Sequence, residues 1–186
     1  PVYAHSDVWK GLDGKLSKVE GKNRRQFDGK FELRDLLVSP VAVPHDVKCY
    51  GFSFSVKEKK ISVVTDIGHF NDKIINEIKG SQIAYIEANY DKDMLFNGTK
   101  YPLSLKRRIA GPNGHLSNID SGDAIDYLAL NGAKQIVLSH LSKENNTPLL
   151  AYNSVCNRLK KDDIIEGRDI RIDVATTQIG AIFRLK

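Results

Sequence analysis

The chain has 186 residues, of which 41% are hydrophobic and 27% are charged, a composition typical of a folded domain rather than a disordered segment. No apolar run approaches the length of a membrane span, and the first residues lack the basic start and apolar stretch of a signal peptide. The two cysteines, Cys49 and Cys156, fit no metal-binding spacing, so we expect reduced thiols in a cytoplasmic protein.

The formal net charge is +5, and basic residues cluster at 22–25, 57–60 and 106–108. Such a charge favours a polyanionic partner such as nucleic acid. A solvated basic surface explains the same composition, and residues 57–60 also suit a hairpin turn. Charge alone therefore leaves both interpretations open.

In chain order, the hydrophobic periodicity predicts antiparallel strands first and then alternating helices and strands. The predicted elements are a helix at 6–16, strands at 30–36, 38–43, 50–56 and 61–65, a helix at 71–78, a strand at 83–87, helices at 104–109 and 120–130, a strand at 135–139, a helix at 148–160, and strands at 170–175 and 180–183. This order predicts an α/β fold, with a mixed sheet flanked by helices in a single domain over residues 1–186.

Polar residues follow three of the predicted strands: His45, Asp66 and His140. An aspartate that leaves an apolar strand into a glycine-containing loop can bridge two divalent cations, and imidazole is a common ligand of zinc-like metals. Each residue alone has a structural alternative, because an aspartate can cap a helix and a histidine can be a hydrogen-bonded structural residue. Together they predict part of a metal-hydrolase site.

His115 lies in a glycine-rich loop that begins at Gly111. A histidine in such a loop, close to metal ions, suits a general acid that protonates a leaving oxygen. The alternative is a histidine that only stabilises the turn.

Six strings carry a resemblance to a known family: residues 65–68, 87–91, 94–95, 101–109, 114–118 and 139–148. They are similar to the YycJ (WalJ) family of metallo-β-lactamase-fold hydrolases, which is related to ribonuclease Z and ribonuclease J. The similarity covers nearly the whole chain.

The resemblance implies an αββα sandwich with two divalent metal ions, zinc or manganese, at one edge. It implies that His45, Asp66 and His140 are metal ligands, with Asp66 bridging, and that His115 is the acid. It also implies phosphodiester hydrolysis of nucleic acid, as a 5′-3′ exonuclease with DNA favoured over RNA.

The chain departs from the family in two places. The histidine-rich His-x-His-x-Asp-His motif is absent, and we expect it just upstream of Pro1, so that this chain is a C-terminal portion with weak or no activity alone. Tyr90 stands where many relatives have histidine. Glu87 and Asp91 nearby are expected to support the loop or to orient His115.

Four further residues are candidate substrate contacts. Lys106 and Arg107 precede the His115 loop and suit contacts with a phosphate backbone, although a solvated helix face is an equal alternative. Ser142 and Asn145 follow His140 and suit hydrogen bonds to phosphate, or they hold the loop.

Two other functions remain open from the sequence. The same fold could hydrolyse a small ester or a cyclic phosphodiester. It could also be a metal-free binding module that keeps the fold without the chemistry.

Overall fold

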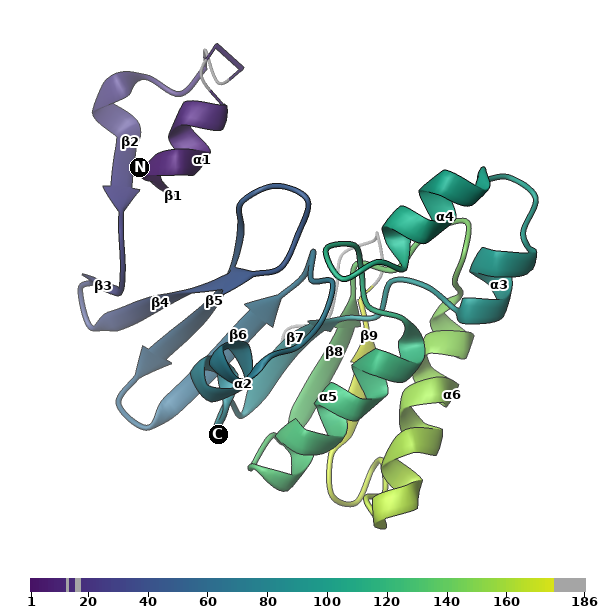
Figure 1. Cartoon of the computed structure of the whole chain (residues 1–186). Helices are drawn as coiled ribbons and strands as arrows, with labels where there is room; N and C mark the ends of the chain where they lie inside the picture. Colours follow the sequence, from purple (N-terminus) through teal and green to yellow (C-terminus); the bar gives the residue numbers. More distant parts are fainter. Residues whose placement is uncertain (13, 16–17, 176–186) are drawn as a thin grey trace.

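The computed structural model describes residues 1–12, 14–15 and 18–175, and its centre is a seven-stranded mixed sheet (Figure 1). The strands lie side by side in chain order: β3 (Phe31–Leu33), β4 (Leu36–Val43), β5 (Cys49–Val56), β6 (Lys59–Val64), β7 (Ile83–Glu87), β8 (Gln135–Ser139) and β9 (Arg171–Val174). Pairing is antiparallel from β3 to β6 and parallel from β6 to β9. This is the predicted α/β class with a mixed sheet.

A smaller unit precedes the large sheet. Strands β1 (Val2–His5) and β2 (Arg24–Phe27) form a parallel pair, with helix α1 (Ser6–Gly11) and a 3₁₀ turn, η1 (Gly21–Asn23), between them in the chain. Within the described residues, this two-stranded pair is the only sheet besides the large one.

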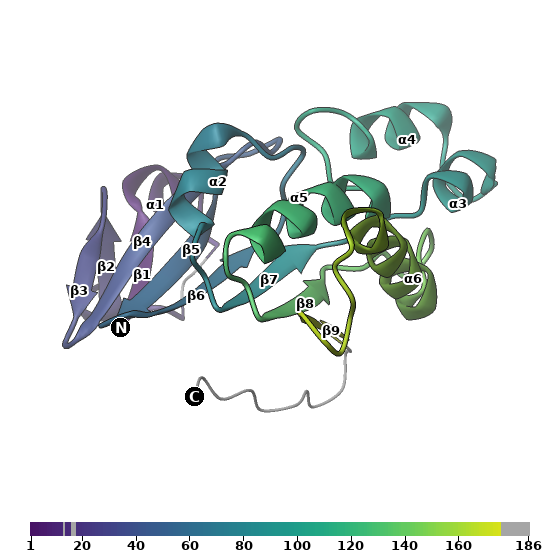
Figure 2. The same ribbon diagram turned by 90° about the horizontal axis from the view of Figure 1, so that it is seen from below.

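Helices cover one face of the large sheet (Figure 2). The three that supply the core are α2 (Asp72–Ile78), α5 (Asn118–Leu130) and α6 (Pro148–Leu159), and η2 (Lys160–Asp162) continues α6. Alternate strand residues such as Val64, Ile86 and Leu138 face them and are fully buried. Helices α3 (Lys92–Asn97) and α4 (Leu103–Ile109) lie beyond the ends of β7 and β8 (Figure 1).

Most predicted elements agree with the structure, and β7 and β8 have the predicted bounds. The predicted strand at 30–36 is wrong, because a turn at Arg34, with φ of 59°, divides it into β3 and the start of β4. The predicted helix at 6–16 is shorter, since α1 ends at Gly11. Helix α3 was not predicted, and the strand predicted at 180–183 lies outside the described residues.

Among the residues with described structure, none of the helices combines the length and apolar character needed to span a bilayer. The parallel pairing of β6, β7 and β8 has the larger consequence for function. Parallel strands end at the same edge of a sheet, so the residues that follow these three strands are brought together there.

Candidate metal centre

The candidate centre lies at the carboxyl edge of the sheet. Asp66 follows β6, Glu87 ends β7 and His140 follows β8, while His45 comes from the loop after β4. His115 reaches the same place from the loop between α4 and α5. The structure thus gathers the four residues predicted from the sequence and places Glu87, expected to support the loop or to orient His115, in their middle.

Two of these residues have an uncommon backbone conformation. Asp66 and His140 are left-handed, with φ of 55° and 56°. Side-chain-bearing residues adopt this region rarely and at an energetic cost, and such residues cluster at functional sites. Each turns the chain sharply at the end of a parallel strand. The side chain of Asn89 donates a hydrogen bond of 2.8 Å to the carbonyl of His140 and supports the second turn.

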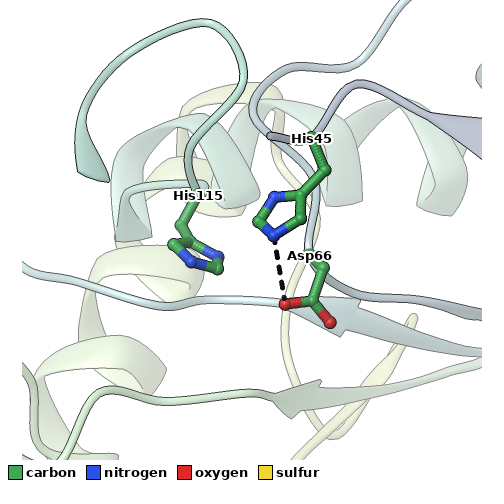
Figure 3. A group of neighbouring side chains, drawn as sticks. All are labelled: His45, Asp66 and His115. Atoms are coloured by element: carbon green, nitrogen blue, oxygen red, sulfur yellow. Dashed lines mark ion pairs between the residues drawn. The ribbon is translucent and has the colours of Figure 1, made fainter. Parts of the chain in front are cut away.

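The side chains of His45, Asp66 and His115 converge, as Figure 3 shows. Nε2 of His45 lies 3.8 Å from Oδ1 of Asp66, and one ligand atom from each of the three residues lies within 4.8 Å of the others. Nε2 of His140 lies 3.6 Å from the same Asp66 oxygen. One carboxylate oxygen therefore faces two imidazole nitrogens.

Glu87 is fully buried and connects three parts of the centre. Its Oε1 accepts hydrogen bonds from Nδ1 of His115 at 2.7 Å and Nδ1 of His140 at 2.6 Å. Its Oε2 accepts from the backbone N–H of Ile67 at 2.8 Å. The carboxylate fixes both imidazole rings and the loop that carries Asp66.

These contacts shift two pKa values in opposite directions. Burial acts to raise the pKa of Glu87, but the hydrogen bonds from His115 and His140 outweigh it, so the net pKa is lowered. The hydrogen bond to Glu87 raises the pKa of His140, and this effect outweighs desolvation, which acts to lower it. Glu87 is accordingly an ionised acceptor, and the imidazole Nδ1 atoms are donors.

The loops of the centre are tightly packed. The N–H of Gly68 donates to the carbonyl of Pro44 at 2.8 Å, and a Cβ at Gly68 would lie 2.1 Å from the Pro112 oxygen. A Cβ at Gly114 would lie 2.1 Å from the Ile109 oxygen. Only glycine allows the backbones of these loops to approach so closely.

The donor set fits divalent metal ions. Histidines that bind metal usually donate their second ring N–H to a carboxylate or carbonyl, which directs the free nitrogen at the metal. Nδ1 of His140 donates to Glu87, and Nδ1 of His45 donates to the carbonyl of Gly114 at 3.2 Å. In both residues Nε2 is left facing Asp66, whose two oxygens can each take one cation.

The predicted substrate contacts have varied positions. Lys106 is buried, and its ammonium group donates to the carbonyls of Phe96 and Gly98 at 2.8 and 2.5 Å. This contact closes the end of α3, so the expected phosphate contact of Lys106 is not supported. Arg107 is exposed on α4.

The backbone and side-chain contacts of the two candidates after His140 connect loop residues. The hydroxyl of Ser142 accepts from the backbone N–H groups of Glu144 and Asn145. Asn145 is buried at 5% exposure, and its backbone carbonyl accepts from the N–H of Asp91. Ser142 nevertheless lines a pocket beside His140 and keeps access to solvent.

Other residues near the motifs have local roles. The carboxylate of Asp91 accepts from the N–H of Met94 and caps α3. Tyr90 is buried at 3% exposure, and burial raises its pKa to about 12. Nδ1 of His69 donates to the carbonyl of Pro112, outside the cluster.

The sequence did not predict the ion pair between Arg108 and Asp46, because no motif relates two residues so far apart in the chain.

The fold and this cluster define the class of the protein: the chain belongs to the beta-lactamase superfamily. The family described as "Beta-lactamase superfamily domain" matches residues 1–141. Exodeoxyribonuclease WalJ of Streptococcus pneumoniae serotype 2 (strain D39 / NCTC 7466) is 32% identical over 176 residues, which cover 92% of this chain and 65% of the relative. Exodeoxyribonuclease YycJ of Bacillus anthracis is 32% identical over 164 residues, which cover 87% of this chain and 62% of the relative.

The resemblance to the YycJ (WalJ) family is confirmed by these relatives, although the chain spans less than two thirds of their length. Two solved structures share the fold. YhfI from Bacillus subtilis has a TM-score of 0.65 at 14% identity, over 96% of this chain and 63% of that chain. Zn²⁺-bound PqqB from Methylobacterium extorquens has a TM-score of 0.63 at 17% identity, over 93% and 61%. The predicted metallo-β-lactamase fold is confirmed.

Proposed function

We propose that this protein is a metal-dependent phosphodiesterase that acts on nucleic acid, and more specifically a 5′-3′ exonuclease on DNA. The observation that carries the proposal is the single oxygen of Asp66 that faces Nε2 of both His45 and His140. A carboxylate in this position could lie between two metal ions, which together stabilise the attacking and leaving oxygens in phosphodiester hydrolysis.

In this proposal His45, Asp66 and His140 would contribute ligands to two divalent cations, zinc or manganese, together with the histidine-rich motif expected upstream. When bound, such cations polarise the phosphoryl group as Lewis acids and stabilise the charge that develops on its oxygens. Glu87 contributes by fixing the ring of His140 through the 2.6 Å hydrogen bond. The buried carboxylate keeps the free nitrogen of His140 directed at Asp66.

We assign His115 as the general acid. Its Nδ1 bonds Oε1 of Glu87 at 2.7 Å, which orients the ring and leaves Nε2 free to carry a proton. Nε2 can then give this proton to the leaving oxygen of the substrate. The mutual orientation of His115 and His140 by one carboxylate supports a shared site for both.

The substrate class rests on charge and on the relatives. The chain carries a net charge of +5, which favours a polyanion, and both curated relatives are named exodeoxyribonucleases. Arg107 and Ser142 remain candidate contacts for the substrate, whereas the ammonium of Lys106 is occupied by two carbonyls and the side chain of Asn145 is buried.

The test uses the product of the complete gene, because this chain spans 65% of a curated relative. Metal-loaded protein is incubated with 5′-labelled and 3′-labelled single-stranded DNA, matching RNA, a cyclic dinucleotide and bis(4-nitrophenyl) phosphate. We expect DNA to be degraded from the 5′ end and the activity to be abolished by a chelator. Faster turnover of the cyclic or small diester would favour the second enzymatic function, and no bound metal would favour a binding module.

A further inference from the structure

A pocket of about 180 Å³ adjoins the candidate metal centre. Two of its lining residues, His45 and His115, belong to the cluster itself. Asp46 and Arg108 line it as well. A ligand in this pocket would therefore touch the metal centre and a guanidinium group at once.

The guanidinium of Arg108 is held at one nitrogen and free at the others. Its Nε donates to Oδ2 of Asp46 at 2.5 Å. Within the described part of the chain its two terminal Nη groups have no hydrogen-bond partner, and the side chain is 66% exposed. A guanidinium has five N–H donors in a rigid plane, so binding at Nε leaves a two-pronged fork available.

Lys106, two residues before Arg108 on α4, has its charged group bound within the protein. The ammonium of Lys106 is occupied by the carbonyls of Phe96 and Gly98 inside the structure. Lys106 therefore offers nothing to a ligand, and of these two residues only Arg108 meets the pocket. The chemistry that suits a guanidinium fork is a phosphate or carboxylate with two oxygens in one plane.

We propose that Arg108, held by Asp46, forms a subsite for a backbone phosphate of a nucleic-acid strand, next to the phosphate under attack. The inference rests on the proposed function, because it assigns the second phosphate to a polynucleotide substrate. The subsite discriminates a strand, which has a neighbouring phosphate, from a small diester, which has none. Asp46 is a positioning residue, since it touches Arg108 rather than the ligand.

The first experiment measures binding without catalysis. The full-length protein in EDTA is titrated into a fluorescein-labelled single-stranded DNA, and anisotropy gives Kd at several salt concentrations. We expect Arg108→Gln to weaken Kd at least tenfold and to lower the slope of log Kd against log salt by about 0.7, the value for one phosphate contact on a single strand. Arg34→Gln is the matched control, because Arg34 is an exposed arginine in the β3–β4 turn outside the pocket.

The Arg108→Lys variant tests whether binding needs the planar guanidinium or only a positive charge. We expect it to recover less than half of the lost binding free energy, because an ammonium cannot bind Asp46 and a phosphate in the same plane. Full recovery by Arg108→Lys, or equal weakening by Arg34→Gln, would overturn the subsite and leave only general electrostatic attraction.

The second experiment compares substrates in the metal-loaded enzyme. We expect Arg108→Gln to lower kcat/KM for DNA at least tenfold more than kcat/KM for bis(4-nitrophenyl) phosphate, mainly through KM. An equal loss on both substrates would contradict the inference and assign Arg108 to supporting the His45 loop. If the wild-type enzyme hydrolyses neither substrate, the proposed function fails on its own, while the anisotropy titration still reports on the subsite.

Discussion

Asp66 and His140 share the same left-handed backbone conformation, and their side chains meet at 3.6 Å between Oδ1 and Nε2. They follow β6 and β8, the two strands that flank β7, so the sheet places them on either side of Glu87. The sharp turn at each strand end aims the side chain across the sheet edge. The energetic cost of two such turns is consistent with a site selected for function rather than for stability alone.

Replacing Glu87 by glutamine is expected to weaken metal binding. Both imidazole N–H groups bond Oε1 and the N–H of Ile67 bonds Oε2, so the NH₂ group of glutamine would face either the Ile67 N–H or both imidazoles. Loss of such a supporting carboxylate reduces metal affinity by about 10- to 100-fold. Competition with a fluorescent chelator measures the change, with Glu32→Gln, at an exposed residue of β3, as the control. Unaltered affinity in Glu87→Gln would show that Glu87 has no role in orienting the ligands.

His115 and His140 are expected to differ in the effect of alanine substitution. His140→Ala should remove bound metal, because its Nε2 faces Asp66. His115→Ala should retain metal and lower turnover by about 10²- to 10⁴-fold, the usual contribution of a general acid. Metal content by mass spectrometry and DNA hydrolysis are measured together, with His69→Ala as a control outside the cluster. Equal metal loss in the two variants would identify His115 as a ligand.

Gly68→Ala is expected to destabilise the fold and to displace the loops of the centre. The new Cβ would lie 2.1 Å from the Pro112 oxygen, so the backbone must move. Overpacking of this kind costs about 1–3 kcal/mol. Urea denaturation measures the free energy of unfolding, and Gly29→Ala is the control because its Cβ meets nothing within 4 Å. A variant as stable as wild type would show that the loops pack less closely than described.

The two thiols are expected to react slowly in the native protein. Burial raises the pKa of both Cys49 and Cys156, so at a given pH less thiolate is present than in the unfolded chain. Reaction with Ellman's reagent at pH 8 should be slow in buffer, faster at higher pH, and rapid in guanidinium chloride. Equal rates with and without denaturant would contradict the burial of Cys156 and the partial burial of Cys49.

The strands that carry the site were predictable because their sequences are unambiguous. The apolar residues of β7 and β8 are long enough for a buried strand and too short for a helix, and a polar residue marks the end of each. The division between β3 and β4 was not predictable in the same way. Arg34 adopts a left-handed conformation that glycine or asparagine usually signals, so the sequence looked like a continuous strand.

The sequence by itself determined the mixed α/β fold, the strand-end residues His45, Asp66 and His140, and the resemblance that assigned them to metals. Only the tertiary structure decided how these residues are held. One buried carboxylate, Glu87, accepts from two imidazoles that different loops supply. No spacing rule contains this information, because partners are selected by the parallel pairing of β6, β7 and β8.

The same distinction applies to the basic residues of α4. In the sequence, Lys106 and Arg108 are equivalent positive charges next to the His115 loop. In the structure, the ammonium of Lys106 donates to two carbonyls at the end of α3, and Arg108 lines a pocket beside the candidate metal centre. The charge of a side chain follows from the residue type. Whether the charged group is available to a ligand depends on which backbone groups the fold brings within reach of it.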